Sequence, residues 1–180
     1  MTSTPEEKPK SSWRIDVSPL RNNPKYRLLW TSATISGFGS LFTYVALPYQ
    51  VQQITHSYVA VGLLGVLEII PLIIFGLYGG VLADARDRRS IAIFTELAFF
   101  VCVLLLAFNA HLTKPALWPI YALALVMASL DGIQRPSLDA IIPRVVPREQ
   151  MAAASALSGL TRNANFIFGT AFGGIVVTQL

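Results

Sequence analysis

The chain alternates between long apolar stretches and short polar segments. Five stretches are each long enough for a helix of about 20 residues, the length that crosses the hydrocarbon core of a bilayer. Their approximate bounds are residues 28–51, 58–83, 90–110, 116–140 and 151–180. The pattern predicts an all-α, polytopic membrane protein with about five transmembrane helices in residues 28–180, preceded by a basic N-terminal tail in residues 1–27.

The composition supports a membrane protein. Of the 180 residues, 53% are hydrophobic and 13% are charged, whereas about 25% of residues are charged in a typical soluble domain. This composition excludes an ordinary cytosolic enzyme and a disordered tail. Cys102 is the single cysteine, so the sequence allows neither an intrachain disulfide nor a metal site built from several cysteines.

The positive charges indicate an orientation. Apart from Lys114, the Lys and Arg residues fall in the tail or near the polar segments that would share its side of the membrane. The positive-inside rule then predicts a cytoplasmic N-terminus in a bacterial inner membrane. The basic residues form no single groove-binding patch, so no nucleic-acid partner is expected. Five spans would leave the C-terminus outside without a polar anchor, and we therefore expect the chain to be part of a longer protein.

The stretch GLYGGVLADARDRR at residues 76–89 has the most informative composition. Gly80 belongs to a run of small residues that permits close helix approach. Asp84, Arg88 and Arg89 follow within one tight turn. The arginines can pair with acids at the inner end of the fourth stretch, and such pairs would form a breakable gate. A plain positive-inside loop has the same composition, and the residues alone leave both interpretations open.

Glu68 and Arg162 are ionisable residues inside the second and fifth apolar stretches. Glu68 is about 16 residues from the inner loop, and so about 24 Å along the helix, near mid-membrane. Such groups are functional candidates, because each costs about 2.5–3.5 kcal/mol to insert. Our hypothesis for Glu68 is proton or cation binding, and the alternative is a buried structural acid. Arg162 in the fifth stretch would meet either an acidic side chain or an anionic substrate.

Further charges lie on the third and fourth stretches. Asp131, Arg135 and Asp139 are spaced at i, i+4 and i+8, and share one helix face if the helix continues through Pro136. Asp131 is a further proton or substrate candidate, and a local pair with Arg135 is the alternative. Glu96 lies near its helix start, where it would reach the interface or join contacts at the inner end.

The fifth stretch carries a face of small and polar residues. At 100° per residue, four residues fall within an arc of about 40°. They are Ser155, Arg162, Gly169 and Gly173. We expect this face to pack against protein, because small residues let helix backbones approach closely.

Three segments resemble the major facilitator superfamily of transporters. GGVLADARDRR resembles the signature loop between its second and third helices, although Ala85 stands where the family has a basic residue and Asp87 where it has glycine. GTAFGG is similar to the antiporter signature GPxxGG, with Thr170 in place of proline. ALPYQVQQITHSYVAVGL, at residues 46–63, looks like the matching part of the enterobactin-exporter and macrolide-efflux branch. The resemblance covers residues 16–180, the first five of twelve expected helices.

The resemblance implies a secondary exporter of a siderophore, drug or similar small amphipathic molecule, working by alternating access with proton counterflow. Its signature loop maps onto Gly80, Asp84, Arg88 and Arg89. The residues that would pair with this loop at the inner end of the bundle, and so form an inner latch, are Glu96, Asp131, Arg135 and Asp139. Gly169, Gly173 and Gly174 would be helix-packing positions. The implied partners are membrane lipid, a small-molecule substrate and a C-terminal half that is missing from this sequence.

Two other functional classes deserve comparison. DGIQR at residues 131–135 faintly resembles the opening of the CDP-alcohol phosphotransferase motif, but the spacing is one residue short and the later carboxylates that would hold a metal are absent. There is no Walker-type phosphate loop, and His56 and His111 are isolated, so no catalytic residue, metal or cofactor is expected. A non-transporting membrane scaffold is the remaining alternative.

Overall fold

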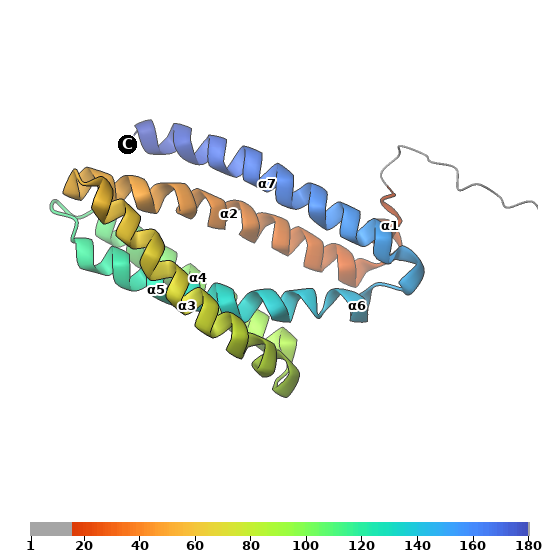
Figure 1. The fold of residues 1–180 in the computed structure, drawn as a ribbon. Helices are drawn as coiled ribbons and strands as arrows, with labels where there is room; N and C mark the ends of the chain where they lie inside the picture. The colour runs from red at the N-terminus through yellow and green to blue at the C-terminus, as the bar shows by residue number, and fades with distance from the viewer. Residues whose placement is uncertain (1–15, 180) are drawn as a thin grey trace, which may run out of the picture.

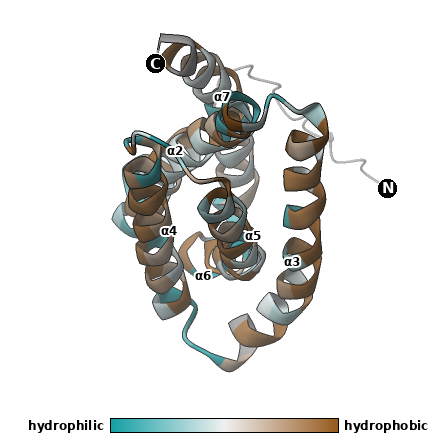
Figure 2. Cartoon of the chain, turned by 90° about the vertical axis from the view of Figure 1, so that its left-hand side faces the viewer, coloured by the Kyte–Doolittle hydropathy of each residue, from teal (hydrophilic) through white to brown (hydrophobic). Residues whose placement is uncertain are grey.

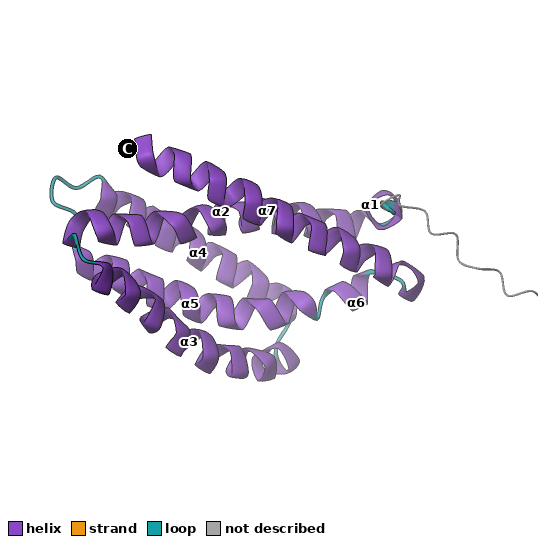
Figure 3. Ribbon diagram, turned by 45° about the horizontal axis from the view of Figure 1, so that its top comes forward, coloured by secondary structure: helices purple, strands orange, loops and turns teal. Residues whose placement is uncertain are grey.

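The computed structural model describes the backbone of residues 16–179, and the side chains of these residues except 83, 84 and 177–179. In this range all regular structure is helical (Figure 3). The elements are α1 (Ser18–Asn22), α2 (Pro24–Thr55), α3 (Tyr58–Ala85), α4 (Arg88–Ala110), α5 (Leu117–Asp139), α6 (Ile142–Val145), the 3-10 helix η1 (Arg148–Gln150) and α7 (Met151–Gln179). Residues 1–15 of the predicted tail lie outside the described part of the chain.

Three of the long helices begin at capping side chains. Asn23, Ser57 and Asp87 accept hydrogen bonds from first-turn N–H groups of α2, α3 and α4, which satisfies donors that a helix start leaves free. Pro24 follows Asn23 at the first helical position, where a missing N–H costs nothing. The helix α2 therefore begins four residues before the apolar stretch predicted to start at residue 28, because a cap and a proline set its start rather than hydropathy.

The helices form two layers (Figure 1). One layer contains α2 and α7, which lie side by side along most of their length. The other contains α3, α4 and α5, with α5 between α3 and α4 (Figure 2). The helix α1, the α3–α4 turn and α6 lie at the same end of the bundle (Figure 1), which we call the basic end because it carries most of the described arginines.

A buried core lies at each end of the bundle. Opposite the basic end it joins α2, α3, α4 and α5 through Leu47, Val51, Leu64, Leu106, Ile120 and Ala124. At the basic end a second core joins the start of α2 to the segment between α6 and the first turns of α7. In this core Tyr26, only 1% exposed, donates a hydrogen bond from its hydroxyl to the Ala154 carbonyl at 3.0 Å. Asn23 donates from its side-chain amide to the Val145 carbonyl.

The α3–α5 contact depends on glycine. A Cβ placed on Gly79 would lie 2.6 Å from the Gly132 carbonyl oxygen, and one placed on Gly132 would lie 2.8 Å from the Gly76 nitrogen. Any side chain here would meet backbone, so the two helices approach closely only because these positions carry none. The crossing fixes α3 against α5 near the basic end.

The outward faces of α3 and α4 are strongly apolar (Figure 2). Ile73 is 59% exposed and Phe94 is 69% exposed. Exposed apolar area on this scale is typical of a surface covered by lipid or by another protein segment. The result agrees with the predicted membrane location and not with a water-exposed bundle.

Three segments of the described chain are long and apolar enough to cross a membrane: Tyr58–Leu82, Arg88–Ala110 and Leu117–Val145. The helices α2 and α7 have sufficient length but do not reach the same apolarity, because Ser, Thr, Gly, Asn and Gln interrupt them. Several α2 hydroxyls donate to carbonyls of the preceding turn, which lowers the cost of placing them in lipid. The count of five spans stays a prediction.

Candidate functional site

The α3–α4 turn consists of Arg86 and Asp87. Hydrogen bonds hold it to the first turn of α4 and to the end of α5. The Asp87 carboxylate accepts hydrogen bonds from the Ser90 backbone N–H at 3.2 Å and from its hydroxyl at 2.8 Å. The hydroxyl is the main cause that holds the pKa of Asp87 below its ordinary value. The Arg88 guanidinium donates from Nη1 to the Ala140 carbonyl at 3.0 Å. The turn is thus tied to the C-terminal end of α5, where helix-end carbonyls attract a cation.

The other residues of the predicted signature loop are less tightly placed. A Cβ on Gly80 would meet no described atom within 4 Å. Asp84 belongs to α3 by its backbone, but its side chain lies outside the described residues. Arg89 is exposed, and its backbone N–H donates to Asp87 Oδ1 at 3.4 Å. The gating role of these residues therefore stays a prediction.

The acids of α5 do not reach the arginines of the turn. Asp131 pairs with Arg135 on the next turn of α5, with 2.6 Å between Oδ2 and Nη2. Asp139 is exposed and makes no hydrogen bond or ion pair with the residues described. The helix does continue through Pro136, as the shared face requires. The structure therefore contains the local pair, and the contact between the turn and α5 is made by a backbone carbonyl, which no sequence pattern marks.

Glu68 lies in the middle of α3 on the side that faces α5. Phe75 and Gly79 of α3 lie against Gly132 of α5. At 100° per residue, both fall within about 20° of Glu68 around the α3 axis. Its side chain is partly exposed, and within the described range it has no hydrogen-bond or ion-pair partner. On one side along α3, the Tyr121 hydroxyl donates to the Ala60 carbonyl at 2.8 Å. On the other side lies the glycine crossing, so Glu68 occupies the interval between two fixed contacts.

Glu96 connects three helices. Its Oε2 accepts a hydrogen bond from the Ser36 hydroxyl of α2 at 2.7 Å, and its Oε1 accepts one from the Gln134 amide of α5 at 3.0 Å. Gln134 is 8% exposed, so its amide requires a partner within the bundle. We call these three residues the polar junction. Glu96 thus joins α4 to α2 and to α5. Its place at the membrane interface or in contacts at the inner end stays a prediction.

The face predicted on α7 packs only in part. A Cβ on Gly169 would lie 3.0 Å from Leu41 of α2, and one on Gly173 would lie 3.3 Å from Val45. These two glycines thus lie in the α2–α7 contact. Gly174 does not, because a Cβ there would meet nothing described within 4 Å. Arg162 is exposed on α7 and has no hydrogen-bond or ion-pair partner in the part of the chain that is described.

Sequence reasoning missed the uncharged members of these contacts. Ser36 and Gln134 complete the polar junction, and the Asn165 amide donates to the Thr34 carbonyl at 3.0 Å between α7 and α2. Their only signal is the presence of amide and hydroxyl side chains within apolar helices, where interhelical hydrogen bonds are favoured. Among the side chains that the structure describes, which exclude Asp84, no group of three His, Cys, Asp or Glu residues is placed to hold a metal ion.

The comparisons with known proteins agree with one another. The family model described as transmembrane secretion effector matches residues 15–180. Three similar proteins are enterobactin exporters: one from Shigella boydii serotype 18, 30% identical over 93% of the chain; one from Salmonella typhimurium strain LT2, 30% identical over 94%; and one from Citrobacter koseri, 29% identical over 93%. The chain spans 40%, 41% and 40% of their respective lengths. No solved structure matches the chain.

The family model covers all of the described helices, including the α3–α4 turn, the glycine crossing and the polar junction. These matches, together with the apolar helices that the structure contains, place the sequence in a family of membrane proteins whose matched relatives are named as exporters. The chain belongs to the transmembrane secretion effector family of the major facilitator superfamily.

Proposed function

We propose that this chain forms the N-terminal helices of a secondary active exporter that moves a siderophore, drug or similar small amphipathic molecule by alternating access. The proposal rests first on family membership and on relatives that are named as enterobactin exporters. In such folds the substrate site lies between two repeats that move against each other. The chain would therefore act together with a C-terminal half of comparable size.

One observation carries the proposal most directly: the hydrogen bond from Arg88 to the Ala140 carbonyl, which ties the α3–α4 turn to the end of α5. A charge-assisted hydrogen bond of this kind is strong enough to favour one arrangement. The bond lies at the end of the bundle, so a modest change in local charge or position can break it. These are the properties that a contact must have if it forms in one transport state and opens in another.

The orientation belongs to the same proposal. The basic end carries α1, the α3–α4 turn and α6, and the positive-inside rule assigns such an end to the cytoplasm. The protein would then lie in a bacterial inner membrane with its N-terminus inside. The opposite end, with the α2–α3 and α4–α5 turns, would face outward.

We assign proton coupling to Glu68. It is an acid in the middle of an apolar helix, on the face toward α5, and among the described residues no cation neutralises it. An acid at such a depth is favoured in its neutral form and changes charge only when its surroundings change. Alternating exposure of this position to the two sides would therefore load and release a proton.

Export from intact cells tests the proposal. The complete reading frame that contains this sequence is expressed in bacteria that lack their own enterobactin exporter, and enterobactin in the medium is measured. Export above the empty-vector level is expected, with loss of pH dependence in Glu68→Gln and normal export in the matched control Glu149→Gln, an exposed position in η1. A complete reading frame that ends at residue 180 and restores no export would favour the scaffold alternative. Unchanged pH dependence in Glu68→Gln would remove this residue from the mechanism.

A further inference from the structure

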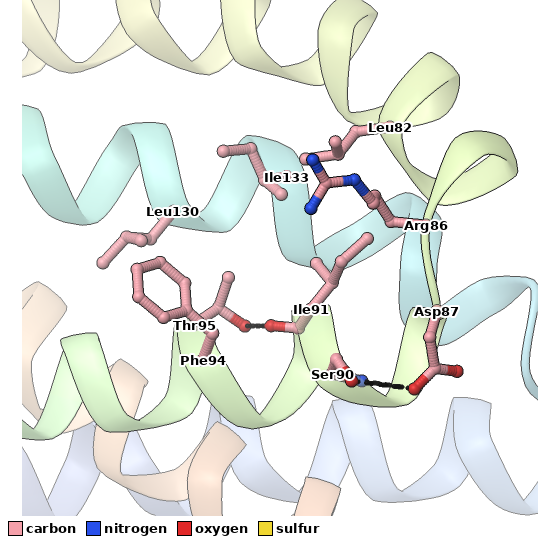
Figure 4. Close-up of a pocket in the computed structure, with 9 residues that line it drawn as sticks. All are labelled: Leu82, Arg86, Asp87, Ser90, Ile91, Phe94, Thr95, Leu130 and Ile133. Carbon is pink, nitrogen blue, oxygen red and sulfur yellow. Dashed lines mark hydrogen bonds between the residues drawn. The ribbon is translucent and has the colours of Figure 1, made fainter.

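A cavity of about 410 Å³ opens beside the α3–α4 turn (Figure 4). It exists because α3 and α4 both pack on α5 and contact each other only slightly. Apolar side chains from all three helices form its wall: Leu82, Ile91, Phe94, Leu130 and Ile133. Its volume is in the range of sites that hold small organic ligands.

Arg86 gives this cavity a charge. The guanidinium of Arg86 points into the space between Leu82 and Ile133 (Figure 4). It makes no hydrogen bond or ion pair with any described residue. The carboxylate of Asp87 is also at the mouth, but it is turned toward Ser90 and accepts two hydrogen bonds there. The cavity thus combines an apolar wall with a cation that has no anionic partner in the described chain.

The ligand that fits is an amphipathic anion. A guanidinium presents several donors in one plane and binds phosphate oxygens through two of them at once. The apolar wall gains free energy by covering a hydrocarbon chain, roughly in proportion to the area removed from water. A free phosphate would use only the first feature, and an uncharged lipid tail only the second.

We propose that this cavity binds one anionic phospholipid, with the phosphate on Arg86 and the upper part of an acyl chain along Phe94 and Leu130. The proposal rests on the cytoplasmic orientation assigned above, which puts the turn at the level of the inner-leaflet headgroups. Basic pockets between helices on that side are suited to anionic headgroups. A lipid seated here would fill the space between α3 and α4 next to the Arg88–Ala140 contact.

Lipid binding to the purified full-length protein in neutral detergent tests this directly. Dioleoyl phosphatidylglycerol is titrated and the bound lipid is counted by native mass spectrometry, with dioleoyl phosphatidylcholine and glycerol 1-phosphate as separate ligands. The variant Arg86→Gln removes the cation at the cavity. The matched control Arg21→Gln removes the same charge from α1, where Arg21 is exposed at the same end of the bundle. Leu82→Trp fills the mouth of the cavity and keeps all charges.

We expect one molecule of phosphatidylglycerol to bind per protein, and to do so at a lower lipid concentration than phosphatidylcholine needs. Arg86→Gln should weaken phosphatidylglycerol binding about tenfold or more, because a hydrogen bond to a charged group is lost. Leu82→Trp should also weaken this binding, whereas Arg21→Gln should leave it unchanged. Equal weakening by Arg86→Gln and Arg21→Gln, or equal binding of the two lipids, would overturn the proposal. Competition by glycerol 1-phosphate at the same concentration as the lipid would overturn it in favour of a free-phosphate site. The measurement needs no transport, so its outcome is independent of the export assay.

Discussion

A side chain introduced at the α3–α5 crossing should separate the two helices. The change is Gly79→Ala, and its matched control is Gly65→Ala on the same helix, where a Cβ would meet no described atom within 4 Å. At Gly79 the new Cβ would lie 2.6 Å from the Gly132 carbonyl oxygen and 2.8 Å from the Ile133 Cα. Both are backbone atoms, so no side chain can rotate away and one helix must move.

The structure sets the size and sign of the effect. Replacing glycine by alanine inside a helix gains about 0.8–1.0 kcal/mol of helix propensity at either position. Overpacking of a tight contact costs about 1–3 kcal/mol, and only Gly79→Ala carries that cost. The two variants should therefore differ by about 1–3 kcal/mol in free energy of unfolding, with Gly79→Ala the less stable.

The difference can be measured as equilibrium unfolding of the purified chain in mixed micelles, by titration with dodecyl sulfate and circular dichroism. A common detergent background cancels the contribution of the micelle, since both variants differ from the parent by one methyl group. If Gly79→Ala unfolds at the same or a higher dodecyl sulfate fraction than Gly65→Ala, the helices do not cross at Gly79 and the arrangement of α3 on α5 is wrong.

Two further contacts give measurable effects. In the polar junction, a double-mutant cycle of Ser36→Ala and Glu96→Gln should give a coupling of about 0.5–1.5 kcal/mol in the same unfolding assay, and additive effects would show that the hydrogen bond between these residues does not contribute. At the turn, Ser90 lowers the pKa of Asp87 from its ordinary value of 3.8, so the cap stabilises the fold above that value and its contribution is lost as the pH falls through the lowered one. Asp87→Asn keeps an acceptor without a charge, so this variant should lose less stability than the parent as the pH falls. An equal loss of stability at low pH in both proteins would show that Asp87 does not cause it.

The helices were predictable because the apolar stretches are long and the breaks between them are polar. The start of α2 at Pro24 was not predicted from hydropathy, since Lys25 and Arg27 make the first turn polar. The pair Asn23–Pro24 does contain the information, as a capping residue followed by a proline. Capping chemistry therefore marks the beginning of α2 better than a hydropathy window does.

The site was predictable only where partners are close in sequence. Asp131 and Arg135 form the i, i+4 pair that their spacing allows. Arg88 instead reaches a carbonyl at Ala140, and every residue has a carbonyl, so no composition or spacing can identify it. Glu96 likewise meets partners from two other helices, and such a meeting depends on how the helices pack.

These contacts indicate where the bundle can move. Along α3, the Tyr121–Ala60 hydrogen bond and the glycine crossing fix the helix against α5 on both sides of Glu68. A change of charge at Glu68 is therefore poorly placed to part α3 from α5, because both contacts resist it. Between the layers, away from the two end cores, Glu96 provides the hydrogen bond that joins α4 to α2. If protonation of Glu68 drives a conformational change, we expect α3 and α5 to shift together against α2 and α7. The contacts that open would then be those of α4, the Ser36–Glu96 bond to α2 and the Arg88–Ala140 bond to the end of α5.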